Sequence, residues 1–130
     1  MALKQIAIDT NIAIEILNGN ENTLQVLSQY DIIALPVTVC GELIYGAKNS
    51  RKARSNLDRY ISFINACEIL DVKTPVASEY ASIKLILKET GHPIPENDIW
   101  IAAVCQSHDV PLLSRDRHFS YISTLHLLDL

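Results

Sequence analysis

The chain has 130 residues, 48% of them hydrophobic, and a formal net charge of -4 at pH 7. This length fits one domain, residues 1–130, and the apolar content is sufficient for a core, which excludes a disordered chain. No apolar run reaches the roughly 18 residues of a membrane span, and the N-terminal segment lacks a signal-peptide pattern. We therefore expect a cytoplasmic protein that does not insert into a membrane.

Strands alternate with helices along the predicted chain. In chain order we expect a strand at 4–8, a helix from 12, a helix at 21–30, a strand at 31–35, helices at 38–48 and 51–66, a strand at 68–72, a helix from Thr74 to Gly91, a helix opening near Asn97, a strand at 111–114, a helical turn near 117–121 and a last strand at 125–130. This alternation is typical of an α/β domain with a mainly parallel sheet.

The helix that opens near Asn97 has an unusual distribution of polarity. Residues 99–105 are apolar without a break, and a helix that is apolar on all sides is usually buried. We interpret Trp100 in this run as a packing residue. Asp98 stands at the entrance of this helix, where an uncompensated carboxylate costs several kcal/mol.

Four carboxylates are expected near one edge of the sheet. Asp9 directly follows the first strand, and Asp116 follows the strand at 111–114 after one residue. Glu42 lies early in the helix after the second strand, and Asp98 opens a later helix. Ligands of parallel sheets bind outside the carboxyl ends of the strands, so the four side chains are predicted to converge there.

Each acid also has an ordinary explanation when it is considered alone. Asp9 is a good helix N-cap, and Asp98 suits the positive end of a helix dipole. Glu42 is compatible with a solvated helix face, and Asp116 with a charged loop. Together, however, carboxylates in one cleft repel each other, and oxygen-only clusters suit hard cations such as Mg²⁺ or Mn²⁺.

Zinc is not expected at this site. The three cysteines have no close spacing, which argues against a disulfide framework and a zinc site, and Cys40 and Cys105 are interpreted as small buried hydrophobic residues. We expect the four histidines to be structural or surface residues: His92, His108, His118 and His126.

Four segments in order resemble the PIN-domain ribonucleases, most closely the VapC toxins of bacterial toxin–antitoxin pairs. The segments are IAIDTNIAIEIL (6–17), PVTVCGELIYGA (36–47), PENDIWIAAVCQSHDVPLLSRD (95–116) and His118-Phe119. The pieces DTN, GEL-x-x-GA, ND-x-WIAA and S-x-D-x-x-F are specific when taken together. The resemblance covers nearly the whole chain and implies a three-layer α/β/α PIN domain with a mainly parallel central sheet.

The resemblance also implies a catalytic site. Its carboxylates, which would bind Mg²⁺ or Mn²⁺, are Asp9, Glu42, Asp98 and Asp116, the fourth being more variable in the family. The polar residues that would support and orient these carboxylates are Asn11, Asn97, Thr10 and Ser114. The implied reaction is metal-assisted hydrolysis of an RNA phosphodiester, which leaves a 5′-phosphate and a 3′-hydroxyl.

Two kinds of protein partner follow from the same resemblance. VapC-like proteins act with a small antitoxin encoded beside them, which often places an arginine or lysine against the acids. The family commonly forms homodimers, often through a helical face. We therefore expect a cognate antitoxin and a homodimer.

Basic residues gather in one part of this acidic chain. Five of them fall within twelve residues: Lys48, Arg51, Lys52, Arg54 and Arg59. Arg115 and Arg117 flank Asp116. These side chains are candidates for binding the RNA backbone, and a solvated helix face explains the first group equally well.

Parts of the sequence pattern are shared with other kinds of protein. A PIN nuclease in RNA maturation, outside toxin–antitoxin biology, and a non-catalytic metal-binding scaffold remain open. A phosphorylatable signalling domain needs an acidic pair after the first strand and a late lysine, but Thr10 and Asn11 follow Asp9 and no lysine follows Lys88. A phosphatase with an Asp-x-Asp pair is disfavoured because position 11 is Asn.

Overall fold

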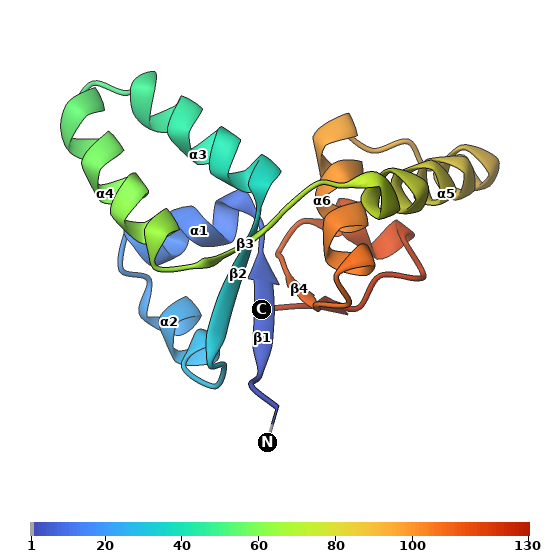
Figure 1. Ribbon diagram of the computed structural model, residues 1–130, viewed down its shortest axis with the longest axis horizontal. Coiled ribbons are helices and arrows are strands. Elements are labelled where there is room, and N and C mark those ends of the chain that lie inside the picture. The colour runs from blue at the N-terminus through green and yellow to red at the C-terminus, as the bar shows by residue number, and fades with distance from the viewer. Residues whose placement is uncertain (1) are drawn as a thin grey trace.

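One sheet of five parallel strands forms the centre of the protein (Figure 1). The computed structural model describes residues 2–130. The strands are β1 (Gln5–Ile8), β2 (Ile32–Pro36), β3 (Glu68–Leu70), β4 (Leu112–Leu113) and β5 (Leu127–Leu128), and their spatial order is β3-β2-β1-β4-β5. The four pairings in this order are parallel, as the alternation of strands and helices predicts.

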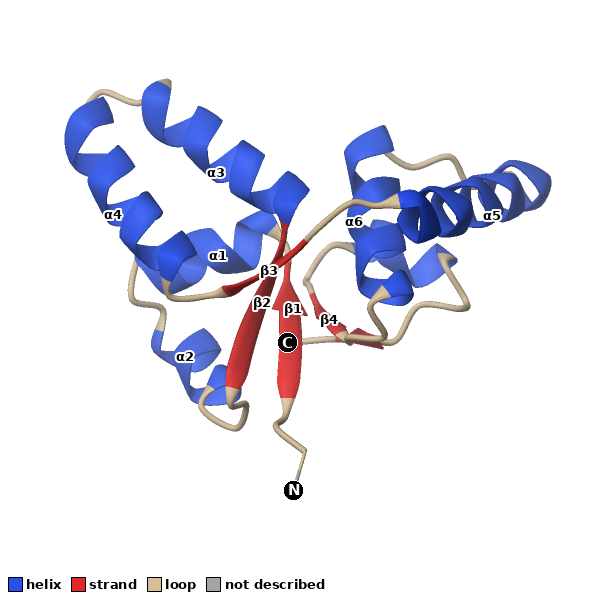
Figure 2. Ribbon diagram, viewed as in Figure 1, coloured by secondary structure: helices blue, strands red, loops and turns tan. Residues whose placement is uncertain are grey.

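Helices cover both faces of the sheet (Figure 2). On one side lie α1 (Thr10–Leu17), α2 (Glu21–Leu27), α3 (Val37–Lys48) and α4 (Ala53–Asn65). On the other side lie α5 (Thr74–Thr90) and α6 (Glu96–Ser107), and a short 3-10 helix, η1 (Arg117–Tyr121), follows β4. This arrangement confirms the predicted three-layer α/β/α fold.

Strands are added to the sheet first on one side of β1 and then on the other. The first half of the chain builds outward from β1 through β2 to β3, and α5 and α6 then return to β4 on the other side of β1. Open α/β sheets bind ligands outside the carboxyl ends of the strands at such a point. The junction of β1 and β4 is therefore the place where this topology favours a site.

The apolar run at 99–105 confirms the prediction of a buried helix. Every residue of this run is buried except Trp100, which is half-buried. Its indole stacks on the ring of Tyr80 in α5, with ring centroids 4.0 Å apart. Trp100 is thus a packing residue between the two helices, and α6 is anchored along its length.

One local prediction from the hydrophobic pattern was wrong. The helical spacing predicts that Leu24 and Leu27 of α2 face inward; Leu27 is buried, but Leu24 is 43% exposed, and Thr23 is buried in its place. The helix starts after Asn20, whose side chain accepts the Thr23 N–H at 3.1 Å, and the Thr23 hydroxyl donates to Glu15. A polar contact to α1, invisible to hydrophobic periodicity, therefore sets which face of α2 is buried.

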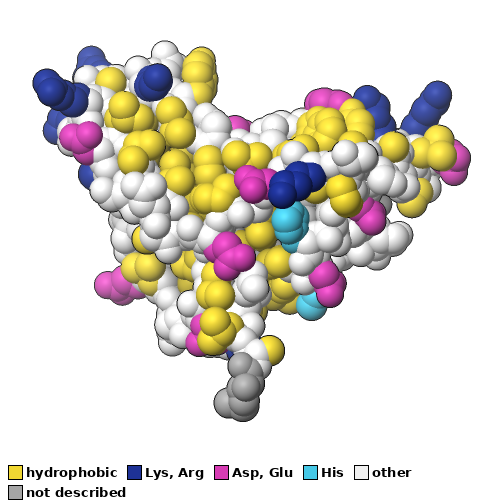
Figure 3. Space-filling view, in the orientation of Figure 1, with side chains coloured by type: hydrophobic (Ala, Val, Ile, Leu, Met, Phe, Trp, Pro, Cys, Tyr) yellow, Lys and Arg dark blue, Asp and Glu magenta, His cyan; other side chains and the backbone are white. Residues whose placement is uncertain are grey.

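The α3–α4 hairpin projects from the body of the protein (Figure 1). Val39, Leu43 and Ala47 of α3 are buried, whereas α4 has no fully buried residue in the structure of residues 2–130. Figure 3 shows a notch between the lobe formed by this hairpin and the lobe formed by α5 and α6.

Residues 2–130 contain no candidate membrane helix and no disulfide. Within residues 2–130, no helix has both the length and the hydropathy that crossing a bilayer requires. Cys40, Cys67 and Cys105 are free thiols, and Cys40 and Cys105 are buried as predicted. Burial raises the pKa of the Cys105 thiol to about 12.

Substitution of Phe119 measures how much the packing of η1 against the core stabilises the protein. Its side chain is fully buried, so Phe119→Ala should lower the free energy of unfolding by about 3–5 kcal/mol, measured by urea denaturation. Phe119→Leu, which keeps most of the volume, should cost clearly less. Equal, small effects of both variants would show that η1 contributes little to the stability of the core.

Candidate metal centre

The four predicted carboxylates lie at the carboxyl edge of the sheet or on helices that begin there. Asp9 follows β1 and is the N-cap of α1, with its Oδ1 accepting a first-turn backbone N–H at 3.0 Å. Asp116 caps η1 in the same way, its Oδ1 accepting the His118 N–H at 2.9 Å. Asp98 is in the first turn of α6, and Glu42 is in the middle of α3.

The pairing of β1 with β4 brings Asp9 beside Ser114. Ile8 and Leu113 are register partners, so the residues that follow them leave the sheet next to each other. The buried Ser114 hydroxyl donates to Asp9 Oδ2, and its oxygen accepts the N–H of Asp116 at 3.0 Å. One hydroxyl therefore links two acids that are far apart in the sequence.

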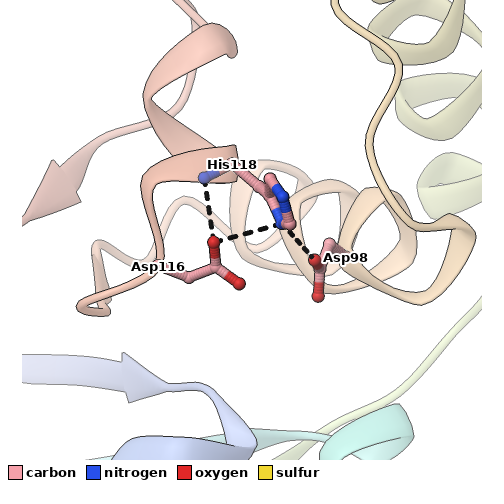
Figure 4. Close-up of side chains that lie close together, drawn as sticks. All are labelled: Asp98, Asp116 and His118. Carbon is pink, nitrogen blue, oxygen red and sulfur yellow. Dashed lines mark hydrogen bonds and ion pairs between the residues drawn. The ribbon is translucent and has the colours of Figure 1, made fainter.

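Asp98, Asp116 and His118 form a cluster of possible metal ligands (Figure 4). One ligand atom from each lies within 4.8 Å of the other two. His118 Nδ1 is 3.1 Å from Asp116 Oδ1 and 3.4 Å from Asp98 Oδ2. This geometry brings a nitrogen and two carboxylates around one point.

Glu42 approaches the cluster from α3. Thr10, the first residue of α1, donates its hydroxyl to Glu42 Oε1 at 2.7 Å, which ties the Glu42 side chain to the start of α1. Glu42 is exposed, and its charge raises the pKa of Asp98. The four acids are thus in electrostatic contact, although Glu42 lies at the open side.

Burial and mutual repulsion disfavour ionised acids in this site. Burial raises the pKa of Asp9 above its ordinary value, and hydrogen bonds from Ser114 and the Ile12 amide offset part of that shift. Burial, followed by the charge of Asp116, raises the pKa of Asp98. A cation placed among these groups would relieve the repulsion that both shifts express.

The side chains present fit a divalent cation. Carboxylate oxygens are the ligands that Mg²⁺ and Mn²⁺ favour, and Asp98, Asp116 and His118 together could hold an ion. The buried hydroxyl of Thr38 has no hydrogen-bond partner among residues 2–130. A water or another polar ligand in the site would give this hydroxyl a partner. Thr38 lies one helical turn before Glu42, on the same face of α3.

The basic residues predicted to bind RNA lie apart from the acids. The exposed side chains of Lys48, Arg51, Lys52 and Arg54 gather at the outer tip of the α3–α4 hairpin, at the upper left of Figure 3. At 1.5 Å per residue, Lys48 is about 9 Å further along α3 than Glu42. The tip is therefore a separate surface beside the site.

Arg115 and Arg117 differ in their surroundings. Arg115 donates to both oxygens of Glu15 in α1, at 2.8 and 3.2 Å, and this pair holds the pKa of Glu15 below its ordinary value. Arg117 is exposed at the start of η1. Arg115 is thus engaged by Glu15, although both basic neighbours of Asp116 are exposed.

The predicted supporting residues are only partly connected to the acids. Thr10 and Ser114 make the contacts described above. Among residues 2–130, the hydrogen-bond partners of the four carboxylates do not include the side chains of Asn11 or Asn97. A supporting role for these two amides stays a prediction.

His118 is the member of the cluster that sequence reasoning missed. It was expected to be a structural or surface residue, yet its ring lies between two of the acids (Figure 4). The available signal was its spacing of two residues from Asp116, which places both side chains on the same short turn.

Comparison with known proteins gives the family-level context. The family model for the PIN domain matches residues 6–125 of this chain. The chain is 32% identical over 124 residues to "Ribonuclease VapC2" of Haemophilus influenzae, covering 91% of this chain and 92% of that protein.

Solved structures share the fold over nearly the whole chain. VapBC-1 from nontypeable Haemophilus influenzae has a TM-score of 0.88 and 25% identity, with 96% of this chain and 97% of that chain covered. VapBC2 from Rickettsia felis, solved bound to a DNA fragment from its promoter, has a TM-score of 0.86 and 26% identity, with 97% and 98% covered.

The raised pKa of Asp98 makes a prediction about the metal-free protein. The folded state holds this proton more tightly than the unfolded chain, so the contribution of Asp98 to the free energy of unfolding falls as pH rises above the ordinary Asp value of 3.8. In EDTA at pH 7, Asp98→Asn should therefore be more stable than the wild type by urea denaturation.

This difference should disappear near pH 3, where the Asp98 carboxyl is protonated in both states. The control is Glu96→Gln, which removes an exposed charge from the same turn of α6 and should change stability little. A less stable Asp98→Asn variant at pH 7 would contradict the argument that burial and repulsion burden this carboxylate.

Proposed function

The chain belongs to the PIN-domain family, and we propose that it is a VapC-like, metal-dependent endoribonuclease that acts as the toxin of a toxin–antitoxin pair. The observation that carries the proposal is the convergence of Asp98, Asp116 and Asp9 at the β1–β4 junction, with Glu42 at its open side. The relatives with this fold support the reaction class, since the Haemophilus influenzae relative is named a ribonuclease.

The proposed mechanism places a cation among the four acids. A divalent cation, when bound, would polarise a phosphodiester and lower the pKa of an attacking water. Asp98, Asp116 and Glu42 would hold this cation with their carboxylates. Asp9, fixed by Ser114 and by its capping bond, would supply a further carboxylate to the same cation site.

Rigidity of the carboxylates is the contribution of the fold to this chemistry. Asp98 extends from a helix buried over residues 99–105, and Asp116 is held by hydrogen bonds at its own N–H and at its Oδ1. Groups fixed in this way need little reorganisation when a phosphate and a cation enter the site. Product ends with a 5′-phosphate and a 3′-hydroxyl are the expected outcome.

We propose a small cognate antitoxin as the protein partner. Its tail is proposed to lie in an open groove of about 490 Å³ between α1 and α4. Apolar and polar residues line this groove together: Ile16, Leu17, Asp58, Arg59, Ser62 and Phe63. The structural relatives are VapBC complexes, which supports a partner of this kind.

We also propose that the chain forms a homodimer. Sedimentation of the purified chain as a monomer would contradict this proposal.

The neighbouring gene separates the toxin from a PIN nuclease in RNA maturation. A small adjacent gene whose product copurifies with this chain and inhibits it would support the toxin. Cleavage activity without such a partner would favour RNA maturation. Metal binding without any RNA cleavage by folded, partner-free protein would leave the non-catalytic scaffold.

Cleavage of RNA tests the proposed chemistry. Purified, partner-free protein should cut total cellular RNA into discrete fragments with Mn²⁺ or Mg²⁺, and EDTA should abolish the fragments. Asp98→Asn should lose at least about 100-fold in rate, because loss of a direct ligand exceeds the 10–100-fold cost of disturbing its neighbours. Glu96→Gln should keep full activity, and full activity of Asp98→Asn would refute the assignment.

The salt dependence of RNA binding tests the basic tip of the α3–α4 hairpin. Arg51 and Arg54 are exposed there, and each phosphate contact contributes about one unit to the slope of log affinity against log salt. The double variant Arg51→Gln, Arg54→Gln should reduce that slope by about 1–2. Lys88→Gln, on α5, should leave it unchanged, and an unchanged slope in the double variant would remove the tip from the RNA interface.

A further inference from the structure

We propose that His118 is a metal ligand of the acidic site, supplying its Nδ1 beside the carboxylates of Asp98 and Asp116. This inference rests on the proposed function and adds a residue to the site. The ring nitrogen stands 3.1 Å from Asp116 Oδ1 and 3.4 Å from Asp98 Oδ2 (Figure 4). Neutral imidazole is a common ligand of metal ions in proteins.

The separations match those of ligands that share one ion. Two atoms at adjacent corners of an octahedron with bonds of about 2.1 Å lie about 3.0 Å apart. Both distances from Nδ1 are close to this value or slightly above it. The three ligand atoms together stay within 4.8 Å, which leaves room for one ion between them.

The alternative is that His118 only donates a hydrogen bond or forms an ion pair with the acids. A bond between a cationic N–H and a carboxylate is usually about 2.7–2.9 Å long. Nδ1 is further than this from both carboxylates and lies between them. Nδ1 thus faces both carboxylates at once, which is the position that a ligand sharing one ion with them requires.

The backbone holds His118 in this place. Asp116 Oδ1 accepts the His118 N–H, and the next residue, Phe119, is fully buried and anchors η1 in the core. The imidazole is therefore fixed on the same turn as Asp116, whereas its side chain is 45% exposed toward the open side of the site. A ligand at the mouth of the site can exchange its metal without unfolding of the core.

None of the other three histidines shares these surroundings in the structure of residues 2–130. His108 hydrogen-bonds the carbonyl of Asp71 at 3.0 Å, and His92 stacks on Tyr121 with ring centroids 4.1 Å apart. His126 is exposed. They provide an internal comparison for any experiment that detects histidine near a metal.

A nitrogen ligand has a consequence for the choice of metal. Mg²⁺ takes oxygen ligands almost throughout, whereas imidazole suits transition metals. The site should therefore bind Mn²⁺ more tightly than Mg²⁺ because of His118. Replacement by an oxygen ligand should reduce this preference.

Electron paramagnetic resonance of Mn²⁺ bound to the full-length, partner-free protein tests the inference directly. Spin-echo modulation from a coordinated ¹⁴N should be present in the wild type and in His126→Gln. It should be absent from His118→Asn, which keeps an N–H near the position of Nδ1 but removes the nitrogen lone pair. Circular dichroism confirms that each variant is folded.

Titration calorimetry supplies the second readout. His118→Asn and His118→Asp should each lower the ratio of Mn²⁺ to Mg²⁺ affinity by about tenfold. Mn²⁺ bound to the wild type without nitrogen modulation, or an unchanged affinity ratio in both variants, would overturn the role of His118 and leave the proposed nuclease intact. A wild type that binds no Mn²⁺ would overturn the metal site itself.

Discussion

The parallel pairing of β1 with β4 is the constraint on which the acidic site depends. It joins residues about a hundred positions apart in the chain, and it leaves Asp9 and Ser114 side by side where the two strands end. Ser114 passes this alignment to Asp116 through a backbone hydrogen bond, and Asp116 in turn orients His118. The site is therefore built outward from one strand junction, with α6 and α3 adding Asp98 and Glu42.

The electrostatics of this arrangement oppose the stability of the metal-free protein. The pKa values of Asp9 and Asp98 are raised by burial and by neighbouring carboxylates, so their ionised forms are disfavoured in the folded state. A fold selected only for stability would replace such groups by apolar residues. Their presence in a rigid frame is the expected signature of a functional centre, where unfavourable charge is retained for ligand binding.

Sequence reasoning predicted most of the fold because its signals were local and strong. The apolar run behind Asp98 predicts a buried helix, and the Thr74-Pro75 pair and Gly91 mark the two ends of α5 to within one residue. Leu24 failed as an inward residue because a hydrogen bond from Thr23 to Glu15 decides the orientation of α2. Periodicity carries no information about such a contact between elements.

The sequence predicted that the four acids lie at one edge of the sheet, and it did not predict the side-chain contacts around them. Strand ends place Asp9 and Asp116 at one edge by topology, helix starts add Glu42 and Asp98 to the same edge, and the resemblance to VapC proteins implies the same four acids. The position of His118 depends on the turn of η1. Arg115 pairs with Glu15, which lies 100 residues away in the sequence. Side-chain partners of this kind follow from the folded chain and are not encoded in residue spacing.

The position of Mn²⁺ in crystals of the partner-free protein, located by its anomalous scattering, would show whether the acids bind a metal. We expect a peak between Asp98 and Asp116, within about 2.2 Å of their oxygens, on the side facing Glu42 and Asp9. Saturating Mn²⁺ that leaves this position without a peak, or that binds only elsewhere, would contradict the view that these carboxylates form a metal centre.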